Sequence, residues 1–283
     1  MSRRHTNRLL GYPPDARLLI INADDFGMCH AVNEAVAGIL REGVVRSTTL
    51  MVPCPWMLHA VHFLRDHPEI AFGVHLTALS EWVDYRWGPV TPKEKVPSLI
   101  DEAGYFYNFE AMPGFLARVS LRELEMEFRT QIEFVLAAGL RPSHLDWHAL
   151  RIGDRGDIFD LLLGLARDYG LALRVAGRPW IEKVQSLGLP ANDYDFLDSY
   201  LLDPASKADR YAERLRDLPA GLSEWAVHPG LDNSELFAID PGGSHIRQAD
   251  FDFFTSRQAK NIIAEEGIIL LDYRALQEVW RDK

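Results

Sequence analysis

Residues 18–27 read LLIINADDFG, a short apolar run that ends in two adjacent carboxylates, Asp24 and Asp25. Residues 30–42 follow with apolar side chains at helical spacing, and residues 48–52 form a second short apolar run. A helical pattern between two short apolar runs predicts two parallel β-strands that are joined by a crossover helix. The first strand therefore carries its two carboxylates at its carboxyl end.

The same alternation continues along the chain. Further short apolar runs predict strands over residues 70–76, 143–146, 171–175, 222–227 and 268–271. Further stretches of helical period predict helices over residues 57–66, 121–138, 158–169, 207–218, 256–266 and 274–281. About seven strands that alternate with helices indicate an α/β protein with a parallel sheet, either closed as a barrel or open. We favour a distorted (β/α) barrel that is similar to a TIM barrel.

The domain organisation follows from where this alternation starts and breaks. Residues 17–283 are predicted to form a single domain, and residues 1–16, which are mostly polar, are predicted to be a flexible N-terminal extension. Two stretches, 86–114 and 176–204, carry prolines and aromatic residues without clear periodicity. We expect loop insertions there, because long loops within compact domains are often lids or binding loops; disorder is the alternative.

Composition excludes several classes of protein. The chain has 283 residues with 30 Lys and Arg against 41 Asp and Glu, a formal net charge of −11, and it has no basic run. Backbone phosphates need clustered positive charge, so nucleic acid and anionic lipid are not expected partners. No stretch approaches the ~20 apolar residues that a membrane span needs. A neutral substrate, or one whose charge is masked, fits the acidic balance of the chain better than a polyanion does.

The two cysteines, Cys29 and Cys54, cannot build a disulfide framework and lack the spacing of a Cys-X-X-Cys metal motif. Two reduced, buried thiols are typical of a reducing compartment. The first residues include arginines but no apolar core of a signal peptide. We therefore expect a cytoplasmic protein. Its oligomeric state stays open, and a homodimer is one option.

Acidic, imidazole and guanidinium groups follow several predicted strands at their carboxyl ends. These residues are Asp24, Asp25, His75, His148, Arg174 and His228. The carboxyl ends of the strands of a β/α barrel share one rim, where enzymes with this architecture carry their active sites. One carboxylate with two imidazoles is a common ligand set for a divalent metal ion, and the second carboxylate is then free to act as a base.

Some of these residues also have a purely structural interpretation. One of the two adjacent carboxylates is a candidate cap for the helix that follows, and His75 lies in an apolar run where a histidine is often a satisfied core residue. Strand alternation places His144, Asp146 and His148 on one face, and packing explains that cluster less easily. His144 or Asp146 is expected to support a metal-bound imidazole through its second ring nitrogen.

Six segments, in order along the chain, resemble the motifs of one family. They read LIINADDFG (19–27), RSTTLM (46–51), GVHLT (73–77), PSHLD (142–146), ALR (172–174) and VHPG (227–230). With these motifs, the chain from residue 17 to residue 273 resembles the YdjC-like carbohydrate deacetylases, a family that includes chitooligosaccharide deacetylases. Residues 96–107, VPSLIDEAGYFY, also look like a family segment.

The resemblance implies a distorted β/α barrel whose reaction removes the acetyl group from an N-acetylated sugar. It also implies that Asp25, His75 and His148 hold one divalent metal ion, Mg²⁺ or Zn²⁺, and that Asp24 is the general base. One departure concerns the substrate. The family often has a histidine-rich run after its fourth motif, whereas residues 147–151 read WHALR here. The expected metal ligand, His148, is present, but the later histidines of the run are absent, and with them the family's usual sugar contacts.

Hydrolysis of an amide needs an activated water, stabilisation of the oxyanion and an acid for the leaving amine. A divalent metal ion would polarise the acetyl oxygen and lower the pKa of a bound water. Asp24 would take the proton, and His228 would protonate the leaving nitrogen. Arg174 would orient Asp24 and keep it ionised, with an outward salt bridge as the alternative for this arginine.

Aromatic side chains near the predicted rim are candidates for stacking on a sugar ring. They are Trp147, Trp180 and Trp87. Tyr105 and Phe106, in the first long insertion, are candidates for a lid. Packing in the core is the alternative for the tryptophans.

Two other functions stay open at this point. The same metal site would polarise a phosphoester or a cyclic amide, so a metal-dependent hydrolase of another bond is the first alternative. A carbohydrate-binding protein that kept the barrel and lost turnover is the second. The combination of a base, an acid and a metal ligand set favours an enzyme, because a binding protein does not need both a base and an acid around a metal.

Overall fold

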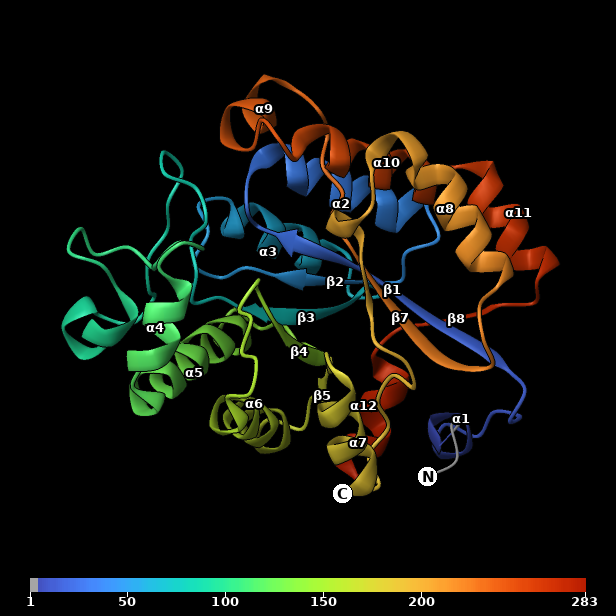
Figure 1. The fold of residues 1–283 in the computed structure, drawn as a ribbon, viewed down its shortest axis with the longest axis horizontal. Helices are drawn as coiled ribbons and strands as arrows, with labels where there is room; N and C mark the ends of the chain where they lie inside the picture. The colour runs from blue at the N-terminus through green and yellow to red at the C-terminus, as the bar shows by residue number, and fades with distance from the viewer. Residues whose placement is uncertain (1–4) are drawn as a thin grey trace.

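The computed structural model describes residues 5–283, and its strands form one eight-stranded sheet (Figure 1). The strands are β1 (Arg17–Phe26), β2 (Ser47–Leu50), β3 (Ala71–Leu76), β4 (His144–Trp147), β5 (Ala172–Leu173), β6 (Leu197–Asp198), β7 (Gly221–Val227) and β8 (Ile269–Leu271). They run in the order β5-β4-β3-β2-β1-β7-β6, and β8 pairs with β1. The pairings between these strands are parallel, as the alternation of strands and helices predicts.

Strand β1 organises the sheet. Along one edge it pairs with β7 from Arg17 to Ala23. Its other edge is divided, because residues 18–20 pair with β8 and the residues from Asn22 onward pair with β2. Within the described chain, β5 and β6 end the sheet without pairing with each other, so the curled sheet stays open there. The predicted distorted (β/α) barrel is confirmed, and the opening between β5 and β6 is its distortion.

Helices pack around the sheet (Figure 1). They are α1 (His5–Leu9), α2 (His30–Glu42), α3 (Met57–Asp66), α4 (Met112–Arg118), α5 (Leu121–Ala137), α6 (Gly156–Asp168), α7 (Arg178–Ser186), α8 (Pro204–Arg216), α9 (Ser234–Ile239), α10 (Ser244–Thr255), α11 (Arg257–Glu265) and α12 (Arg274–Arg281), with 3₁₀ turns η1 (Lys93–Lys95), η2 (Pro97–Leu99) and η3 (Ser199–Leu201). In α5, Leu124, Phe128 and Ile132 are buried at intervals of four residues, which places one apolar stripe against the sheet. None of the described helices is long and apolar enough to cross a membrane.

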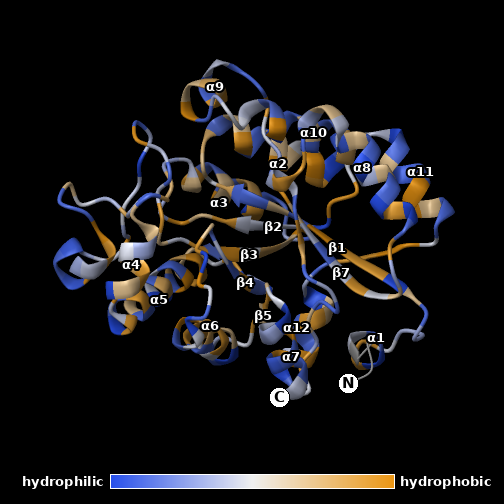
Figure 2. Ribbon diagram, in the orientation of Figure 1, coloured by the Kyte–Doolittle hydropathy of each residue, from blue (hydrophilic) through white to orange (hydrophobic). Residues whose placement is uncertain are grey.

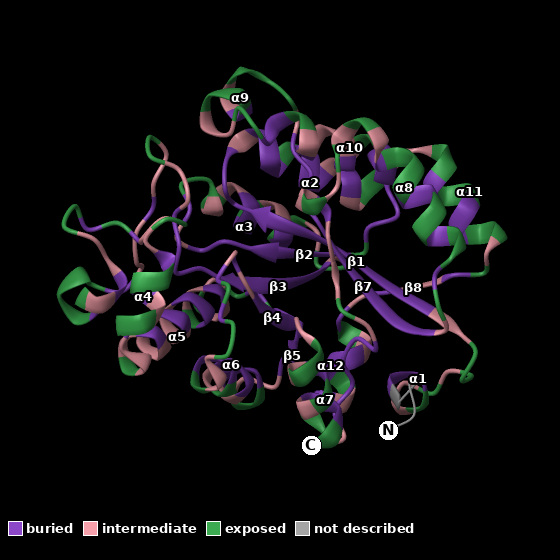
Figure 3. Ribbon diagram, viewed as in Figure 1, coloured by how far each residue is buried: buried purple, intermediate pink, exposed green. Residues whose placement is uncertain are grey.

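The core lies between the sheet and these helices. Leu18, Leu19 and Ile20 of β1 are fully buried, and Figure 3 shows β1, β2, β3 and β7 as buried along their length, while Figure 2 shows β3 as mostly hydrophobic. A parallel sheet that is covered by helices needs such continuous apolar runs, because both faces of each strand are buried. The polar residues at the carboxyl end of β1 therefore stand out against their apolar surroundings.

The two predicted insertions contain regular elements that the sequence did not reveal. Residues 86–114 hold η1, η2 and the start of α4, and the carboxylate of Glu127 in α5 accepts hydrogen bonds from the backbone N–H groups of Val90 and Thr91, both at 2.9 Å. Residues 176–204 hold α7, β6 and η3. Contacts with distant parts of the chain stabilise these short elements, so their own sequences carry little periodicity.

The predicted N-terminal extension, residues 1–16, is described only in part, because residues 1–4 lie outside the described residues. In the rest of the segment, α1 packs against β7. The side-chain amide of Asn7 is buried and donates hydrogen bonds to the carbonyl oxygens of Pro13 and Ala16, each at 2.9 Å. The described part is therefore a packed helix and turn. The single domain over the rest of the chain stays a prediction.

Candidate active site

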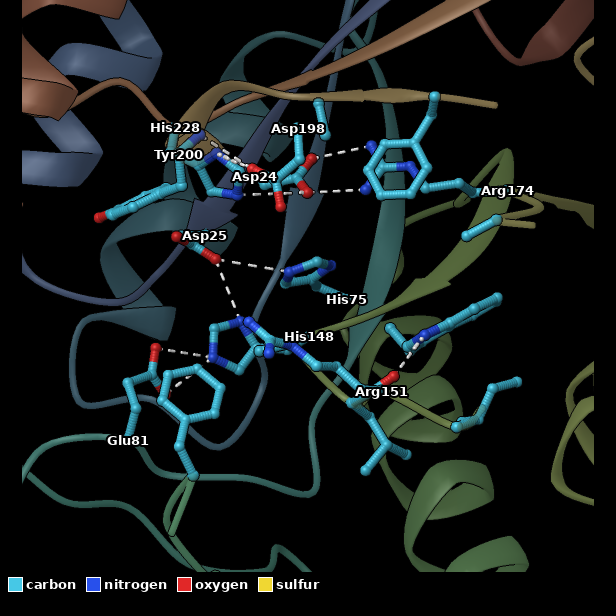
Figure 4. A pocket seen from close by; sticks show the side chains of 18 of the residues that line it. Asp24, Asp25, His75, Glu81, His148, Arg151, Arg174, Asp198, Tyr200 and His228 are labelled. Carbon is cyan, nitrogen blue, oxygen red and sulfur yellow. Dashed lines mark hydrogen bonds and ion pairs between the residues drawn. The ribbon is translucent and has the colours of Figure 1, made fainter. Parts of the chain in front are cut away.

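The carboxyl ends of β1, β3, β4, β5 and β7 meet at one rim and surround a cavity of about 1030 Å³ (Figure 4). The side chains that the sequence placed at this rim line the cavity together: Asp24, Asp25, His75, His148, Arg174 and His228. Each lies at the end of its strand or directly after it. Parallel pairing brings these distant residues together, because it places the carboxyl ends of the strands at one edge of the sheet.

The end of β1 is irregular, and this irregularity turns both carboxylates toward the cavity. The register with β2 shifts between Ala23 and Phe26, and Asp25 has a positive φ of 68°. Gly27 follows with a φ of 101°, and a Cβ atom there would lie 3.1 Å from the carbonyl oxygen of Met51. Positive φ costs a non-glycine residue of order 1–3 kcal/mol, so the surrounding structure must hold Asp25 in place.

Asp25, His75 and His148 form a buried cluster with the composition of a metal site. The Oδ1 atom of Asp25 lies 3.4 Å from Nε2 of His75 and 3.2 Å from Nδ1 of His148. Within residues 5–283, this buried oxygen has no hydrogen-bond partner. Two ligands of a tetrahedral Zn²⁺ with bonds of about 2.0–2.1 Å lie about 3.3 Å apart, which matches both separations. The three atoms therefore fit a divalent ion, which would satisfy the unpartnered oxygen.

Second partners orient the two imidazoles. Nδ1–H of His75 donates to Asp146 at 2.7 Å, and Nε2–H of His148 donates to Glu81 at 2.9 Å. In the neutral form of each ring, the other nitrogen then carries the lone pair that a metal ion needs. Of the two residues expected to support an imidazole, Asp146 is the one that does so.

Arg247 of α10 orients the third candidate ligand. Its Nη2 donates to Oδ2 of Asp25 at 2.7 Å, which leaves Oδ1 of the carboxylate for a metal ion. Burial raises the pKa of Asp25, but Arg247 and the two imidazoles hold it well below its usual value. The guanidinium of Arg247 also lies over the ring of Tyr200, 5.1 Å from its centroid, and Nε is 3.9 Å from Asp240.

In the absence of a metal ion, both imidazoles hold protons tightly. Burial lowers the pKa of His75, but Asp146 and Asp25 outweigh burial and raise it to about 10. Burial also lowers the pKa of His148, but Glu81 and Asp25 raise it to about 9. A metal ion would replace one proton on each ring, because a ligating nitrogen must be deprotonated.

Asp24 lies beside this cluster in a network of its own. Nη1 and Nη2 of Arg174 donate to its two oxygens at 2.7 and 2.8 Å, and the side-chain amide of Asn22 donates at 2.7 Å. Burial raises the pKa of Asp24, but Arg174 holds it well below its usual value. Arg174 also contacts Asp146 and Glu224, each at 2.7 Å. Arg174 therefore joins an inward network rather than an outward salt bridge.

Figure 4 shows Asp24 between His228 and Arg174. Nε2 of His228 lies 3.9 Å from Oδ2 of Asp24, and the side chain is 14% exposed. Nδ1 of the same ring lies 2.8 Å from the hydroxyl of Ser199. The backbone N–H of His228 donates to Asp250 at 2.8 Å. The Nδ1 side of the ring and the backbone are thus held by hydrogen bonds, and Nε2 faces the cavity.

The predicted aromatic contacts divide into two groups. Trp147 and Trp180 line the cavity. Trp87 is buried, and its indole N–H donates to a backbone carbonyl. Tyr105 and Phe106 are not among the described residues that line the cavity. Phe106 is fully buried in the core and Tyr105 lies against cationic side chains, so the structure does not bring these two residues to the site as a lid.

His144 lies on the same strand but outside the candidate metal site. Its ring stacks on that of Tyr273, with centroids 3.6 Å apart, and Nδ1 lies 3.0 Å from the hydroxyl of Ser143. Burial lowers the pKa of His144 to about 3, so the ring is a neutral packing group. This histidine has the structural role that the sequence left open for His75.

Sequence reasoning missed Glu81 and Arg247, which contact two of the candidate ligands. Glu81 follows β3 and lies at the same rim as the other residues, so its position was an available signal. No signal in the sequence pointed to Arg247, because α10 was not predicted and the contact with Asp25 spans 222 positions. The cavity is also lined by Tyr200, in η3, and by Asp240, directly after α9, and neither of these elements was predicted.

The fold and the site together define a class of protein: an open β/α barrel with a buried Asp-His-His cluster, a second aspartate and a third histidine around one cavity. The family described as YdjC-like protein matches residues 18–265. The chain belongs to this family, and the resemblance of its motifs is confirmed.

Named relatives cover nearly the whole chain. A carbohydrate deacetylase from Enterococcus faecalis is 33% identical over 267 residues, which is 91% of this chain and 97% of the relative. A chitooligosaccharide deacetylase from Serratia marcescens is 27% identical and covers 92% of this chain and 99% of its own. The crystal structure of a putative cellobiose-phosphate cleavage protein from Enterococcus faecalis is similar, with a TM-score of 0.81, 32% identity and coverage of 92% and 99%.

Proposed function

We propose that this protein is a metal-dependent carbohydrate deacetylase, a hydrolase that removes the acetyl group from an N-acetylated sugar. The observation that carries the proposal is the pair of adjacent aspartates, of which Asp25 belongs to a metal-type cluster while Asp24 is held separately by Arg174. The names of the relatives, carbohydrate deacetylase and chitooligosaccharide deacetylase, support the same reaction.

One divalent ion would be held by Oδ1 of Asp25, Nε2 of His75 and Nδ1 of His148. When bound, the ion supplies Lewis-acid polarisation of the acetyl carbonyl and lowers the pKa of water. Two imidazole nitrogens and one carboxylate suit Zn²⁺ better than Mg²⁺, which prefers oxygen ligands. We therefore expect Zn²⁺ or a similar transition-metal ion rather than Mg²⁺.

Asp24 is the general base in this proposal. Arg174 keeps its carboxylate ionised by holding the pKa well below its usual value, so an acceptor is present over the whole neutral range. The two hydrogen bonds from Arg174 also fix the plane of the carboxylate at the cavity wall. Asp24 takes the proton of the attacking water, a contribution of about 10²–10⁴ in rate for a well-placed base.

His228 is the general acid in this proposal. Its Nε2 faces the cavity on the side of Asp24, and its backbone and its Nδ1 are both held by hydrogen bonds. Nε2–H gives its proton to the leaving nitrogen as the C–N bond breaks, because an amine anion is too poor a leaving group to depart unprotonated. The base and the acid thus act from neighbouring parts of one cavity wall.

The cavity is suited to a sugar. Its volume of about 1030 Å³ lies near the upper end of the roughly 300–1,000 Å³ that small-molecule sites occupy. Trp147 and Trp180 supply flat apolar faces, and polar groups come from Arg151, at the position of the family's histidine-rich run, and from Asp154.

The test is acetate release from N-acetylglucosamine and its β-linked oligomers, with added Zn²⁺ or Mg²⁺ and with a chelator. We expect release that a chelator stops and that Zn²⁺ restores. His75→Ala is expected to lose bound metal and activity together, whereas His62→Ala, at an exposed position of α3, keeps both. Bound metal without release from any of these substrates would contradict the proposed reaction and favour hydrolysis of another bond.

We also propose a cytoplasmic location and leave a homodimer as an option for the assembly. The two thiols, Cys29 and Cys54, are free and buried, and burial raises the pKa of both, as is typical of reduced structural cysteines. Fractionation of the native cells and the mass of the purified protein in solution test these two statements.

A further inference from the structure

The proposed acid, His228, rests on a serine of the second insertion. The hydroxyl of Ser199, the first residue of η3, lies 2.8 Å from Nδ1 of the imidazole. The serine is fully buried, and the contact joins the segment after β6 to the end of β7. Residues 176–204 therefore contribute a side chain to the site from behind, in addition to those that line the cavity.

The proposed role of His228 fixes the direction of this hydrogen bond, because an imidazolium that acts as an acid has a proton on both ring nitrogens. Nδ1–H of His228 therefore donates, and the hydroxyl oxygen of Ser199 accepts. The phenol of Tyr211 in α8 donates to Asp250 at 2.9 Å. Burial and the Asp250 carboxylate raise the pKa of Tyr211, so this phenol stays protonated as the donor to Asp250.

Asp250 also belongs to a buried ion pair. Asp250 of α10 lies 2.9 Å from Nζ of Lys207 in α8, and both side chains are fully buried. The same carboxylate accepts the backbone N–H of His228 at 2.8 Å. Asp250 therefore anchors the histidine at its backbone, while Ser199 holds its ring.

The other groups that face the ring stand further away. Oδ2 of Asp24 lies 3.9 Å from Nε2, and Oδ1 of Asp198 lies 3.9 Å from Nδ1. The ring of Tyr200 meets the imidazole edge-on, with centroids 4.9 Å apart. Neither carboxylate is within hydrogen-bond distance. In the part of the chain that the structure describes, Ser199 is therefore the side chain that sets the rotation of the ring.

We propose that Ser199 is the positioning residue of His228: its hydroxyl accepts from Nδ1–H and so aims Nε2 at the leaving nitrogen of a substrate in the cavity. The inference rests on the proposed function, in which the Nε2 proton passes to that nitrogen. As the C–N bond breaks, its electron pair stays on nitrogen and forms the new N–H bond. His228 ends neutral with Nδ1–H, so the bond to Ser199 persists before and after the transfer.

The test compares two substrates that differ in their need for an acid. The first is the best N-acetylated sugar, and the second is p-nitrophenyl acetate, whose leaving phenolate departs without a proton. We expect Ser199→Ala to lower kcat on the amide by about tenfold or more and to change ester hydrolysis by less than about twofold. Ser199→Thr keeps the hydroxyl and is expected to recover most of the amide activity.

A matched control is Ser206→Ala, because the hydroxyl of this serine of α8 donates to the backbone carbonyl of Asp203 at the start of its own helix. It is expected to leave both rates unchanged. An equal loss of amide and ester hydrolysis in Ser199→Ala would show a merely structural hydroxyl and overturn the inference, as would unchanged amide hydrolysis. If the wild-type chain releases no acetate from any N-acetylated sugar, the proposed function is wrong, and the inference that rests on it is wrong as well.

Discussion

Two adjacent aspartates at the end of β1 have different partners, and the difference comes from the backbone. On a regular strand, neighbours point to opposite faces. The positive φ of Asp25 and the register shift beside it bring both carboxylates to the rim, where Asp24 meets Arg174 and Asp25 meets two imidazoles and Arg247. The proposed roles of base and metal ligand are thus separated within one dipeptide.

Asp24→Asn is expected to separate catalysis from metal binding. The amide cannot accept the proton of a water, so kcat should fall by about 10²–10⁴. The metal cluster contains no atom of Asp24, so bound metal should stay at the wild-type level. Kinetics and metal analysis on the same sample check this, with Asp66→Asn, at the exposed end of α3, as the control. Full activity of Asp24→Asn with metal bound would refute the assignment of the base.

Metal affinity is expected to rise with pH. In the metal-free fold the pKa of His75 is raised to about 10 and that of His148 to about 9, above the usual value of about 6.5. Their protonation therefore stabilises the metal-free fold below pH 6.5, and this contribution is lost as pH rises through 9 to 10. A metal ion must displace these protons at neutral pH, so we expect at least about a tenfold gain in affinity per pH unit.

Titration of the metal-free protein with Zn²⁺ at pH 6, 7 and 8, in competition with a chelator of known affinity, measures this dependence. The number of protons released on binding provides a second reading of the same quantity. An affinity that stays constant across these three pH values would mean that both rings are neutral before the metal binds.

At the scale of elements, the strands and the long helices were predictable because their sequences carry the period of the structure. The apolar run of β1 and the stripe of α5 are examples. The two-residue strand β6 and the helices α7 and α9 were not predicted. Helix α10, with 12 residues, was not predicted either, because its buried side includes Ser244, Arg247 and Asp250 and so shows no apolar stripe. This is why His75 and His148 could be placed from the sequence and Arg247 could not.

Glycine substitutions test how tightly the end of β1 is constrained. Gly27→Ala combines a φ of +101° with a contact of 3.1 Å to a backbone oxygen, so we expect a loss of about 2 kcal/mol or more in the free energy of unfolding. Gly139→Ala has a similar φ of +80° but open space, and should cost about 1 kcal/mol. Gly164→Ala, within α6 and in open space, should stabilise by about 0.5–1 kcal/mol.

Urea denaturation of the three variants ranks them. The order expected from most to least destabilised is Gly27→Ala, Gly139→Ala and Gly164→Ala. Equal losses at the first two positions would show that positive φ alone, without the close approach at the end of β1, accounts for the cost.

At the scale of the whole molecule, the candidate ligands come from β1, β3 and β4, so the cluster exists only when the sheet is folded. The strands β5 and β6 do not pair with each other. The segments that follow these two strands line the cavity instead, with Arg174, Trp180 and Tyr200. The shape of this cavity depends on contacts between distant segments that no local pattern of the sequence shows.

Metal binding is therefore expected to stabilise the whole fold. At a free Zn²⁺ concentration of 100 times Kd, the linkage amounts to about 2.7 kcal/mol, which corresponds to a rise in Tm of several degrees. Calorimetry with Zn²⁺ and with a chelator measures it, and His148→Ala should abolish the difference. The same rise in His148→Ala would show that the ion binds elsewhere.

The most direct test of the account is acetate release from an N-acetylated sugar, measured against the amount of Zn²⁺ bound per chain as metal is added to the metal-free protein. We expect release to rise in proportion to bound metal and to stop rising at one ion per chain. Full release from the metal-free chain, or a fully loaded chain that releases no acetate from any N-acetylated sugar, would contradict it.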